Sequence, residues 1–280
     1  MGENVLNTLL NLILNPFFIR ALVGLILVAI ASSCIGPILN SRGMAFLTAE
    51  VAHATLGGAA LGILLHEYIS TIDPLIIALL FGVLSGLLAG YAGKTGIPEE
   101  LETAIGVTLA FAMSIAVLLL AIIPSEDIPL VWGYLLGDIL LLSDSDLIIL
   151  SVIVVITVVI YLLFYREFIY IAFDIDGAEA LGLNTRLYHY LSIFISSLAI
   201  VAATKAIGSI MVYAFMIAPP SIALVFCRRI STSTIISFII IMVTGLIGLT
   251  SSFVINIAPS GLIGILICIL YLISVTFRHR

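Results

Sequence analysis

Glu50 and His53 have residue types and a spacing that could bind a metal ion. Side chains three residues apart on a helix differ by about 60° around the helix axis, so we expect both to point the same way. Both lie in a long apolar run, where ionisable groups are costly and usually face the bundle interior or a water-filled path. A carboxylate and an imidazole are a partial ligand set for Zn²⁺ or Mn²⁺. The alternative is that they only hydrogen-bond to each other or to a neighbouring helix.

A second informative stretch is the polar segment 173–186, which could contact a soluble partner. It opens with an aspartate typical of a helix N-cap, Asp174 or Asp176, continues through Glu179, and reaches Gly182, a residue type that commonly closes a helix. A short helix of this kind between apolar runs is a natural docking element. An ordinary solvated connector is the alternative.

The elements that position these residues are long apolar helices. Of the 280 residues, 62% are apolar and 9% are charged, whereas soluble domains have roughly 45–50% and about 25%. A spanning helix needs about 20 mostly apolar residues. We therefore expect an all-α, polytopic transmembrane bundle of about 8–9 spans, forming a single domain over residues 1–280, with 1–16 as an interfacial or terminal segment. The expected spans are 17–40, 44–68, 74–93, 104–123, 146–165, 187–204, 207–227, 231–251 and 257–277.

Three features interrupt or shape these runs. The stretch 129–142 is short and bracketed by Pro124, Pro129 and Asp138, so we interpret it as a re-entrant or half helix. Pro219 and Pro220 predict that the helix carrying them ends or kinks near Ala218. Small residues at a spacing of four predict close packing against another helix, namely Ala54, Gly58 and Gly62.

Basic residues predict the orientation, because cytoplasmic loops are enriched in Lys and Arg. Threading the spans in order places the N-terminus outside, the C-terminus inside, and most basic residues on the cytoplasmic side. Arg20 and Lys205 fall on the opposite side. The residues that define the cytoplasmic side are Arg42, Lys94, Arg166, Arg186, Arg228, Arg229, Arg278 and Arg280.

The sequence argues against an enzyme. It has no HExxH or GxSxG motif. Gly93-Lys94-Thr95 resembles the end of a phosphate-binding loop, but Leu88 stands where that motif needs glycine. The three cysteines have no metal or disulfide spacing. An ion-coupled secondary transporter stays open as an alternative, although it would need charged groups in several spans.

Together these stretches resemble the ABC-3 permeases, the membrane subunits of ATP-driven zinc and manganese importers, which are similar to the iron-siderophore and cobalamin permeases. The similarity extends over nearly the whole chain. The motifs that carry it are, in order, Arg42-Gly-Met-Ala-Phe with Glu50 to His53 and Gly57, then Glu102-Thr-Ala-Ile-Gly106, Trp132-Gly-Tyr-Leu-Leu-Gly-Asp138, Phe173-Asp174 with Ala178 and Leu181-Gly182-Leu183, and Gly208 to Pro219.

The resemblance implies a multi-pass permease in the cell membrane that works as a homodimer among membrane lipid. It further implies a separate ATP-binding subunit that performs the hydrolysis and an extracytoplasmic metal-binding protein, with no nucleic acid, no permanently bound cofactor, and Zn²⁺ or Mn²⁺ as cargo. A permease for a metal chelate is the alternative within this class. The segment implied to couple to the ATPase comprises Asp174, Asp176, Ala178, Glu179, Gly182 and Leu183.

The chain departs from the family pattern at the metal motif. Aligning His53 with the family histidine puts Ala49 where the family has aspartate, and the proline after the motif is absent. Only His53 therefore carries over directly. Glu50 is our substitute for the aspartate, inferred from helical geometry.

Overall fold

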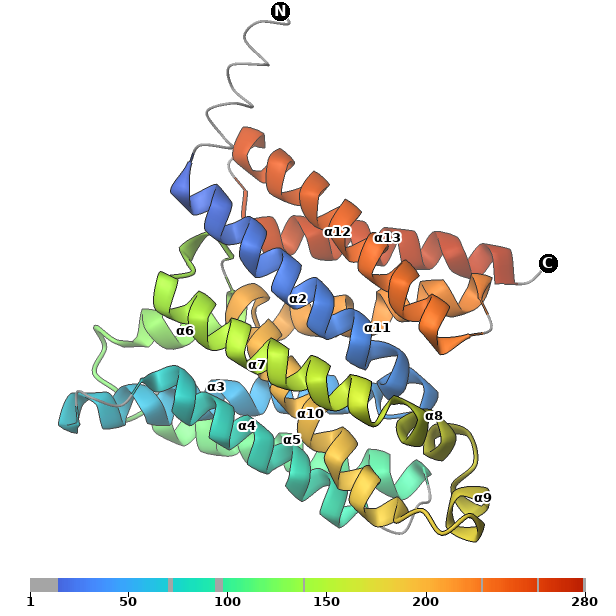
Figure 1. Cartoon of the computed structure of the whole chain (residues 1–280). Coiled ribbons are helices and arrows are strands. Elements are labelled where there is room, and N and C mark those ends of the chain that lie inside the picture. Colours follow the sequence, from blue (N-terminus) through green and yellow to red (C-terminus); the bar gives the residue numbers. More distant parts are fainter. Residues whose placement is uncertain are drawn as a thin grey trace, which may run out of the picture.

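The computed structural model describes residues 15–69, 73–93, 98–137, 139–227, 229–255 and 257–278, and these residues form helices and turns without a strand (Figure 1). Residues 1–14, most of the expected N-terminal segment, lie outside them. The elements are α2 (Pro16–Ser41), α3 (Ala45–Tyr68), α4 (Pro74–Ala92), α5 (Pro98–Leu120), α6 (Ile128–Leu136), the 3₁₀ helix η1 (Ile139–Leu141), α7 (Asp144–Leu163), α8 (Tyr165–Phe173), α9 (Ile175–Ala180), α10 (Thr185–Ile207), α11 (Ser209–Phe226), α12 (Ile230–Ile255) and α13 (Pro259–Arg278).

Nine of the described helices are long and apolar enough to cross a membrane, which confirms the polytopic all-α bundle. They are α2, α3, α4, α5, α7, α10, α11, α12 and α13. The interpretation of 129–142 as a half helix is also confirmed, because α6 has nine residues and stops at Gly137. Asp138 lies outside the described residues.

Local sequence signals set several helix starts. Asn15 and Asp73 each accept a backbone hydrogen bond at the N-terminus of a helix whose first residue is proline, Pro16 in α2 and Pro74 in α4. Ser143 forms a full capping box with Asp146 at the start of α7. These caps satisfy backbone N–H groups that would otherwise lack partners at the ends of the spans.

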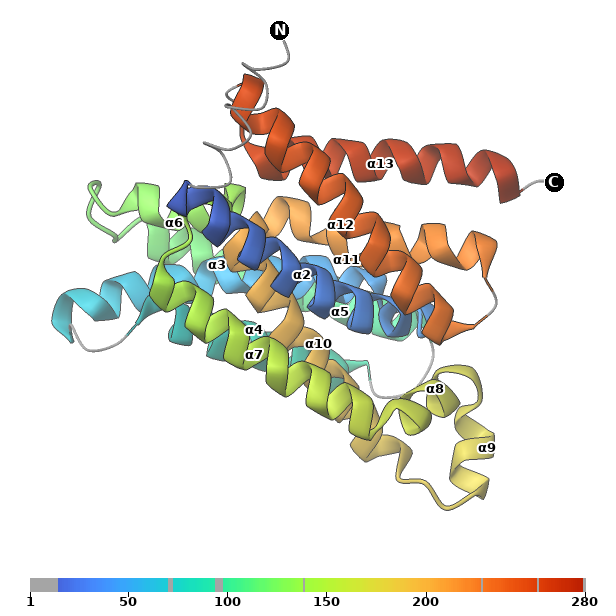
Figure 2. The same cartoon turned by 45° about the horizontal axis from the view of Figure 1, so that its top comes forward.

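The helices pack in two groups joined by α10 and by direct contact between α11 and α3. One group contains α3, α4 and α5, the other contains α2, α11, α12 and α13, and α10 contacts α3 and α4 as well as α2 and α11 (Figures 1 and 2). Residues 195–204 of α10 are all buried, as this central position requires. Small residues permit the closest approach between α3 and α4: a Cβ atom built on Gly58 or Gly62 would lie 2.8 Å from Cα of Ala78 or Pro74, respectively. The predicted packing ridge on α3 is thus confirmed for these two glycines.

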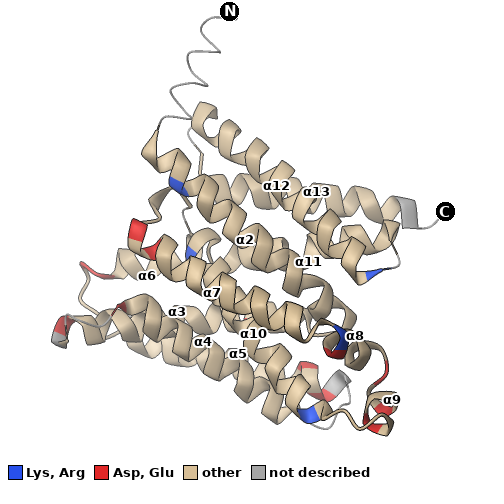
Figure 3. Ribbon diagram, viewed as in Figure 1, with Lys and Arg blue, Asp and Glu red and all other residues tan. Residues whose placement is uncertain are grey.

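Charged residues gather at the two ends of the bundle, leaving its middle almost free of them (Figure 3). The two basic residues that opposed the charge bias have acidic neighbours: Arg20 pairs with Asp144 at 2.7 Å, and Lys205 pairs with Asp146 at 3.3 Å. Their charges are therefore balanced locally by the first turn of α7. Lys94, Arg228 and Arg280 lie outside the described residues, and the orientation stays a prediction.

Of the two outcomes expected near Ala218, an end of the helix is wrong, because α11 continues through Pro219 and Pro220 to Phe226, whereas a kink there stays a prediction. Both prolines are buried, and Pro220 lies close to Gly36 of α2. The chain reverses instead at Gly208, whose φ of +84° suits glycine. Gly208 packs against the backbone of Gly137, which also has positive φ, +65°. A side chain at either glycine would separate these two turns.

Candidate functional site

The turn between α2 and α3 fixes the start of the helix that carries Glu50 and His53. Arg42 ends α2, Gly43 takes a φ of +66°, and the Met44 N–H donates to the carbonyl of Leu39 at 2.9 Å. The Met44 side chain is buried. Because this turn is short and hydrogen-bonded, it fixes the direction of α3 relative to α2.

The side chain of Glu50 has no accessible surface and is directed toward α4. One carboxyl oxygen accepts a hydrogen bond from the hydroxyl of Ser85 on α4. The other oxygen, Oε2, has no hydrogen-bond partner among the described residues. Glu50 thus joins α3 to α4, as the hydrogen-bonding alternative expects, while keeping an unused acceptor.

The imidazole of His53 lies in different surroundings, on a half-buried face of α3. Its Nδ1 lies 2.8 Å from the carbonyl oxygen of Ala49. A carbonyl only accepts hydrogen bonds, so Nδ1 must carry the proton and the lone pair of Nε2 is left for another partner. Phe46, one turn before Ala49, is 54% exposed. The first turns of this side of α3 are therefore partly open in a single copy of the chain, whereas Leu56, Gly57 and Ala60 further along it are buried.

The structure leaves the metal role of the pair a prediction. Glu50 and His53 are near neighbours on α3, but Glu50 is turned toward α4 and His53 lies on a half-buried side, so the expectation that both point the same way is not met. Within the described ranges no three His, Cys, Asp or Glu side chains come together as a metal site would require.

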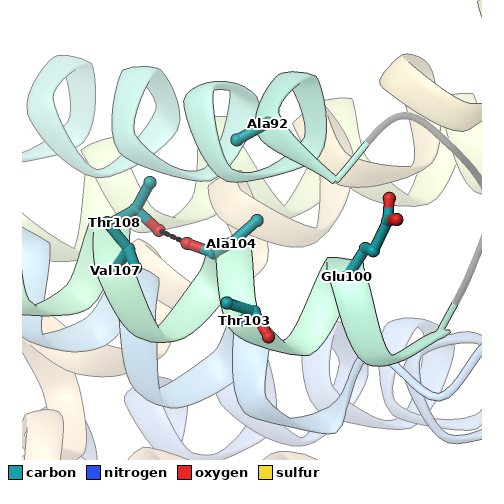
Figure 4. A pocket seen from close by; sticks show the side chains of 6 residues that line it. All are labelled: Ala92, Glu100, Thr103, Ala104, Val107 and Thr108. Carbon is teal, nitrogen blue, oxygen red and sulfur yellow. Dashed lines mark hydrogen bonds between the residues drawn. The ribbon is translucent and has the colours of Figure 1, made fainter.

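A groove between α4 and α5 runs close to this region, with a volume of about 450 Å³ (Figure 4). Thr108 lies in its wall and donates to the carbonyl of Ala104 at 2.9 Å. Val107, in the same wall, is 64% exposed on the outside of the bundle. The groove therefore opens to the surroundings of the helices, and we assign no metal site to it. Its lining residues are Ala92, Glu100, Thr103, Ala104, Val107 and Thr108.

The predicted short helix in the segment 173–186 is confirmed as α9, which lies with α8 at one end of the bundle (Figure 1). Of the two aspartates considered as caps, Asp174 is the one that caps α9, accepting from the Gly177 N–H at 2.8 Å, and Asp176 lies in the first turn.

The end of α9 is closed by glycine. The N–H of Leu183 donates to the carbonyl of Ala178 at 3.0 Å, and Gly182 has a φ of +81°. The Glu179 carboxylate accepts from the Thr185 hydroxyl at 2.7 Å, which ties α9 to the start of α10. The role of this segment in coupling stays a prediction.

Sequence reasoning missed a polar contact at the end of α2. The guanidinium of Arg42 donates to the hydroxyl of Ser192 and to Nδ1 of His189, which lie on α10. Residues 42 and 189 are separated by 147 positions, and no local pattern links them. The position of Arg42 at the start of a family-like motif was the available signal, and it does not indicate a partner on α10.

Comparison with known proteins places the chain in a family. The Manganese transport system membrane protein MntC of Listeria monocytogenes is 28% identical over 264 residues, which are 94% of this chain and 91% of the relative. The Manganese import system permease protein ScaB of Streptococcus parasanguinis is 29% identical over 92% of this chain and 89% of its own. Among solved structures, PsaBC from Streptococcus pneumoniae in complex with Fab aligns with a TM-score of 0.82 and 25% identity, covering 96% of this chain and 95% of that chain.

The chain also matches the sequence pattern of a protein family. The ABC 3 transport family pattern extends over residues 15–278, which includes every described helix and every motif considered above. The chain therefore belongs to the ABC 3 transport family.

Proposed function

We propose that this chain is the transmembrane permease subunit of an ATP-driven importer of Mn²⁺ or of a chemically similar divalent cation such as Zn²⁺. The observation that carries the proposal is the family match over residues 15–278, together with relatives named for manganese transport that align over nearly their full length. The nine apolar helices supply the membrane domain that such a subunit needs.

The partly open side of the first turns of α3, which carries His53, supports a cation path between two copies of the chain. His53 has its Nε2 lone pair available, and a neutral imidazole is a good ligand for these metals. Glu50 offers a carboxylate whose Oε2 is unused, although it would have to turn away from Ser85 to reach the same ion. The same residues from a second copy would raise the ligand number to four.

A weak site suits this function. Transport requires binding that is strong enough to admit the ion and weak enough to release it. An incomplete ligand set in each copy, completed only when two copies meet, gives such a site. Closing or opening the dimer would then make or break it.

The energy for transport comes, in this proposal, from a separate ATP-binding subunit that docks on α9. The chain supports this division of labour, because its longest polar segment is the region 173–186 and this region is too short for a nucleotide-binding domain. An extracytoplasmic binding protein would deliver the cation to the opposite side.

Uptake by reconstituted vesicles tests the proposed function. The permease, its ATP-binding subunit and the binding protein are placed in liposomes, and accumulation of radioactive Mn²⁺ is measured with ATP or a non-hydrolysable analogue inside. We expect ATP-dependent uptake that Zn²⁺ competes with and a ferric siderophore does not. Uptake that needs a proton gradient instead of ATP, or that requires a chelate, would contradict the proposal.

A further inference from the structure

Arg42 is a half-buried cation without a carboxylate partner among the described residues. Burial lowers the pKa of its guanidinium to about 10, so the group remains charged at neutral pH. Removing a charge from water is costly unless hydrogen bonds replace the lost hydration. The two contacts that Arg42 makes on α10 must therefore matter to the local structure.

These contacts hold the guanidinium in a fixed geometry. The Arg42 guanidinium lies 2.7 Å from Nδ1 of His189, and because arginine only donates, the imidazole must accept through Nδ1. Ser192 accepts a second bond from Arg42 while donating its own proton to the His189 carbonyl at 2.8 Å. The two acceptors, on His189 and Ser192, lie one helical turn apart and together fix the orientation of the guanidinium.

The start of α10 is held on its other side by the segment that contains α8 and α9. The ring of Tyr188 packs edge-on against Phe164 and Phe168, with centroid distances of 5.7 and 6.4 Å. The Thr185 hydroxyl donates to Glu179 of α9 at 2.7 Å. A displacement of α9 is therefore transmitted directly to the first residues of α10.

Arg42, in turn, is joined directly to the start of α3. Only Gly43 and Met44 separate it from this helix, and both the Arg42 and Met44 N–H groups bond back to carbonyls of α2. A force that α10 exerts on the guanidinium consequently acts on the turn from which α3 begins. His53 lies on α3, less than three helical turns beyond this point.

We propose that Arg42, His189 and Ser192 form a polar clamp through which movement of α9 repositions α3 during the transport cycle. The clamp residues are positioning residues that do not touch the cation. This inference rests on the proposed function, since it needs a transport cycle driven from the α9 side. It predicts that loosening the clamp separates ATP hydrolysis from cation movement.

Two matched pairs of variants test the clamp in the intact complex. His189→Leu removes the acceptor, whereas His189→Asn keeps an oxygen near the position of Nδ1. Ser192→Ala removes the second acceptor, whereas Ser196→Ala removes a buried hydroxyl on the same helix that has no partner among the described residues. The measurement is the number of Mn²⁺ ions taken up per ATP hydrolysed, with co-purification of the ATP-binding subunit as the test of assembly.

The expected result is a selective loss of coupling. His189→Leu should lower the ion-to-ATP ratio roughly tenfold, within the usual range of coupling between two sites, while assembly and ATP hydrolysis persist. His189→Asn and Ser196→Ala should stay close to the wild-type ratio, and Ser192→Ala should fall below it. Adding His189→Leu to Arg42→Gln should not lower the ratio below that of Arg42→Gln alone, because Arg42 is the shared partner of both contacts.

Two outcomes would overturn the clamp. One is an unchanged ion-to-ATP ratio in His189→Leu, and the other is a loss of assembly that His189→Asn fails to rescue. Failure of the proposed function looks different, because the wild-type complex itself would then show no ATP-dependent Mn²⁺ uptake in the same vesicles.

Discussion

Replacing Gly36 with alanine perturbs the close crossing of α2 and α11. A Cβ atom at this position would lie 2.8 Å from Cγ of Pro220 and would overlap the carbonyl oxygen of Met216. Carbon atoms normally approach to about 3.5–4.0 Å, so one helix would have to move by roughly 1 Å. The proline ring cannot rotate away as a flexible side chain could, and the carbonyl belongs to the backbone.

Gly106 provides the matched control, because a Cβ there meets no atom within 4 Å among the described residues. Both substitutions gain about 1 kcal/mol of helix propensity, whereas Gly36→Ala alone introduces overlap, which typically costs about 1–3 kcal/mol. We therefore expect Gly36→Ala to be less stable than Gly106→Ala by that difference.

Thermal unfolding of the purified permease in one detergent measures this difference. At about 2–4 °C per kcal/mol for a chain of this size, the midpoint of Gly36→Ala should fall several degrees below that of Gly106→Ala. Equal midpoints, or a higher one for Gly36→Ala, would show that α2 and α11 are not packed as described. The reasoning from the glycine contacts would then fail.

Three further predictions address coupling, topology and the buried carboxyl. Glu179→Ala, which removes the contact between α9 and α10, should reduce metal uptake several-fold while the spans remain folded, and normal uptake would place the coupling element elsewhere. In a cysteine-free background, cysteines at Ser125 and Ser231 should react with an impermeant reagent from opposite sides of the membrane, and reaction of both from outside would overturn the predicted threading. Ser85→Ala removes a hydrogen bond to the buried Glu50 and should destabilise the protein by about 1–3 kcal/mol in thermal unfolding, whereas no change would show that this bond is not formed.

The sequence predicted the fold because the decisive signals are local. Apolar runs of spanning length set the nine helices, and the aspartate and glycine at the ends of α9 set its bounds. Of the expected end or kink at Ala218, the end was wrong, because the helix accommodates both prolines, of which Pro220 packs close to Gly36 of α2. The reversal occurs at Gly208, where a positive φ is required.

The surroundings of the candidate site could not be predicted, because they depend on residues far apart in the chain. Nothing near Glu50 in sequence indicates Ser85, and nothing near Arg42 indicates His189. Helical periodicity predicted that Glu50 and His53 point the same way, but it could not show that Glu50 packs against α4 while His53 lies on a half-buried side. Only the packing of the whole bundle decides this.

Cation uptake by the His53→Ala variant tests the central claim most directly. The intact complex is reconstituted with wild-type, His53→Ala or Glu50→Gln permease, and ATP-dependent accumulation of Mn²⁺ is compared at equal amounts of assembled protein. Loss of the imidazole removes the one ligand already free to bind, so we predict that His53→Ala abolishes uptake and leaves assembly intact, with Glu50→Gln also strongly impaired. Uptake of unchanged rate and metal selectivity in both variants would contradict the account and leave the pair a purely structural role.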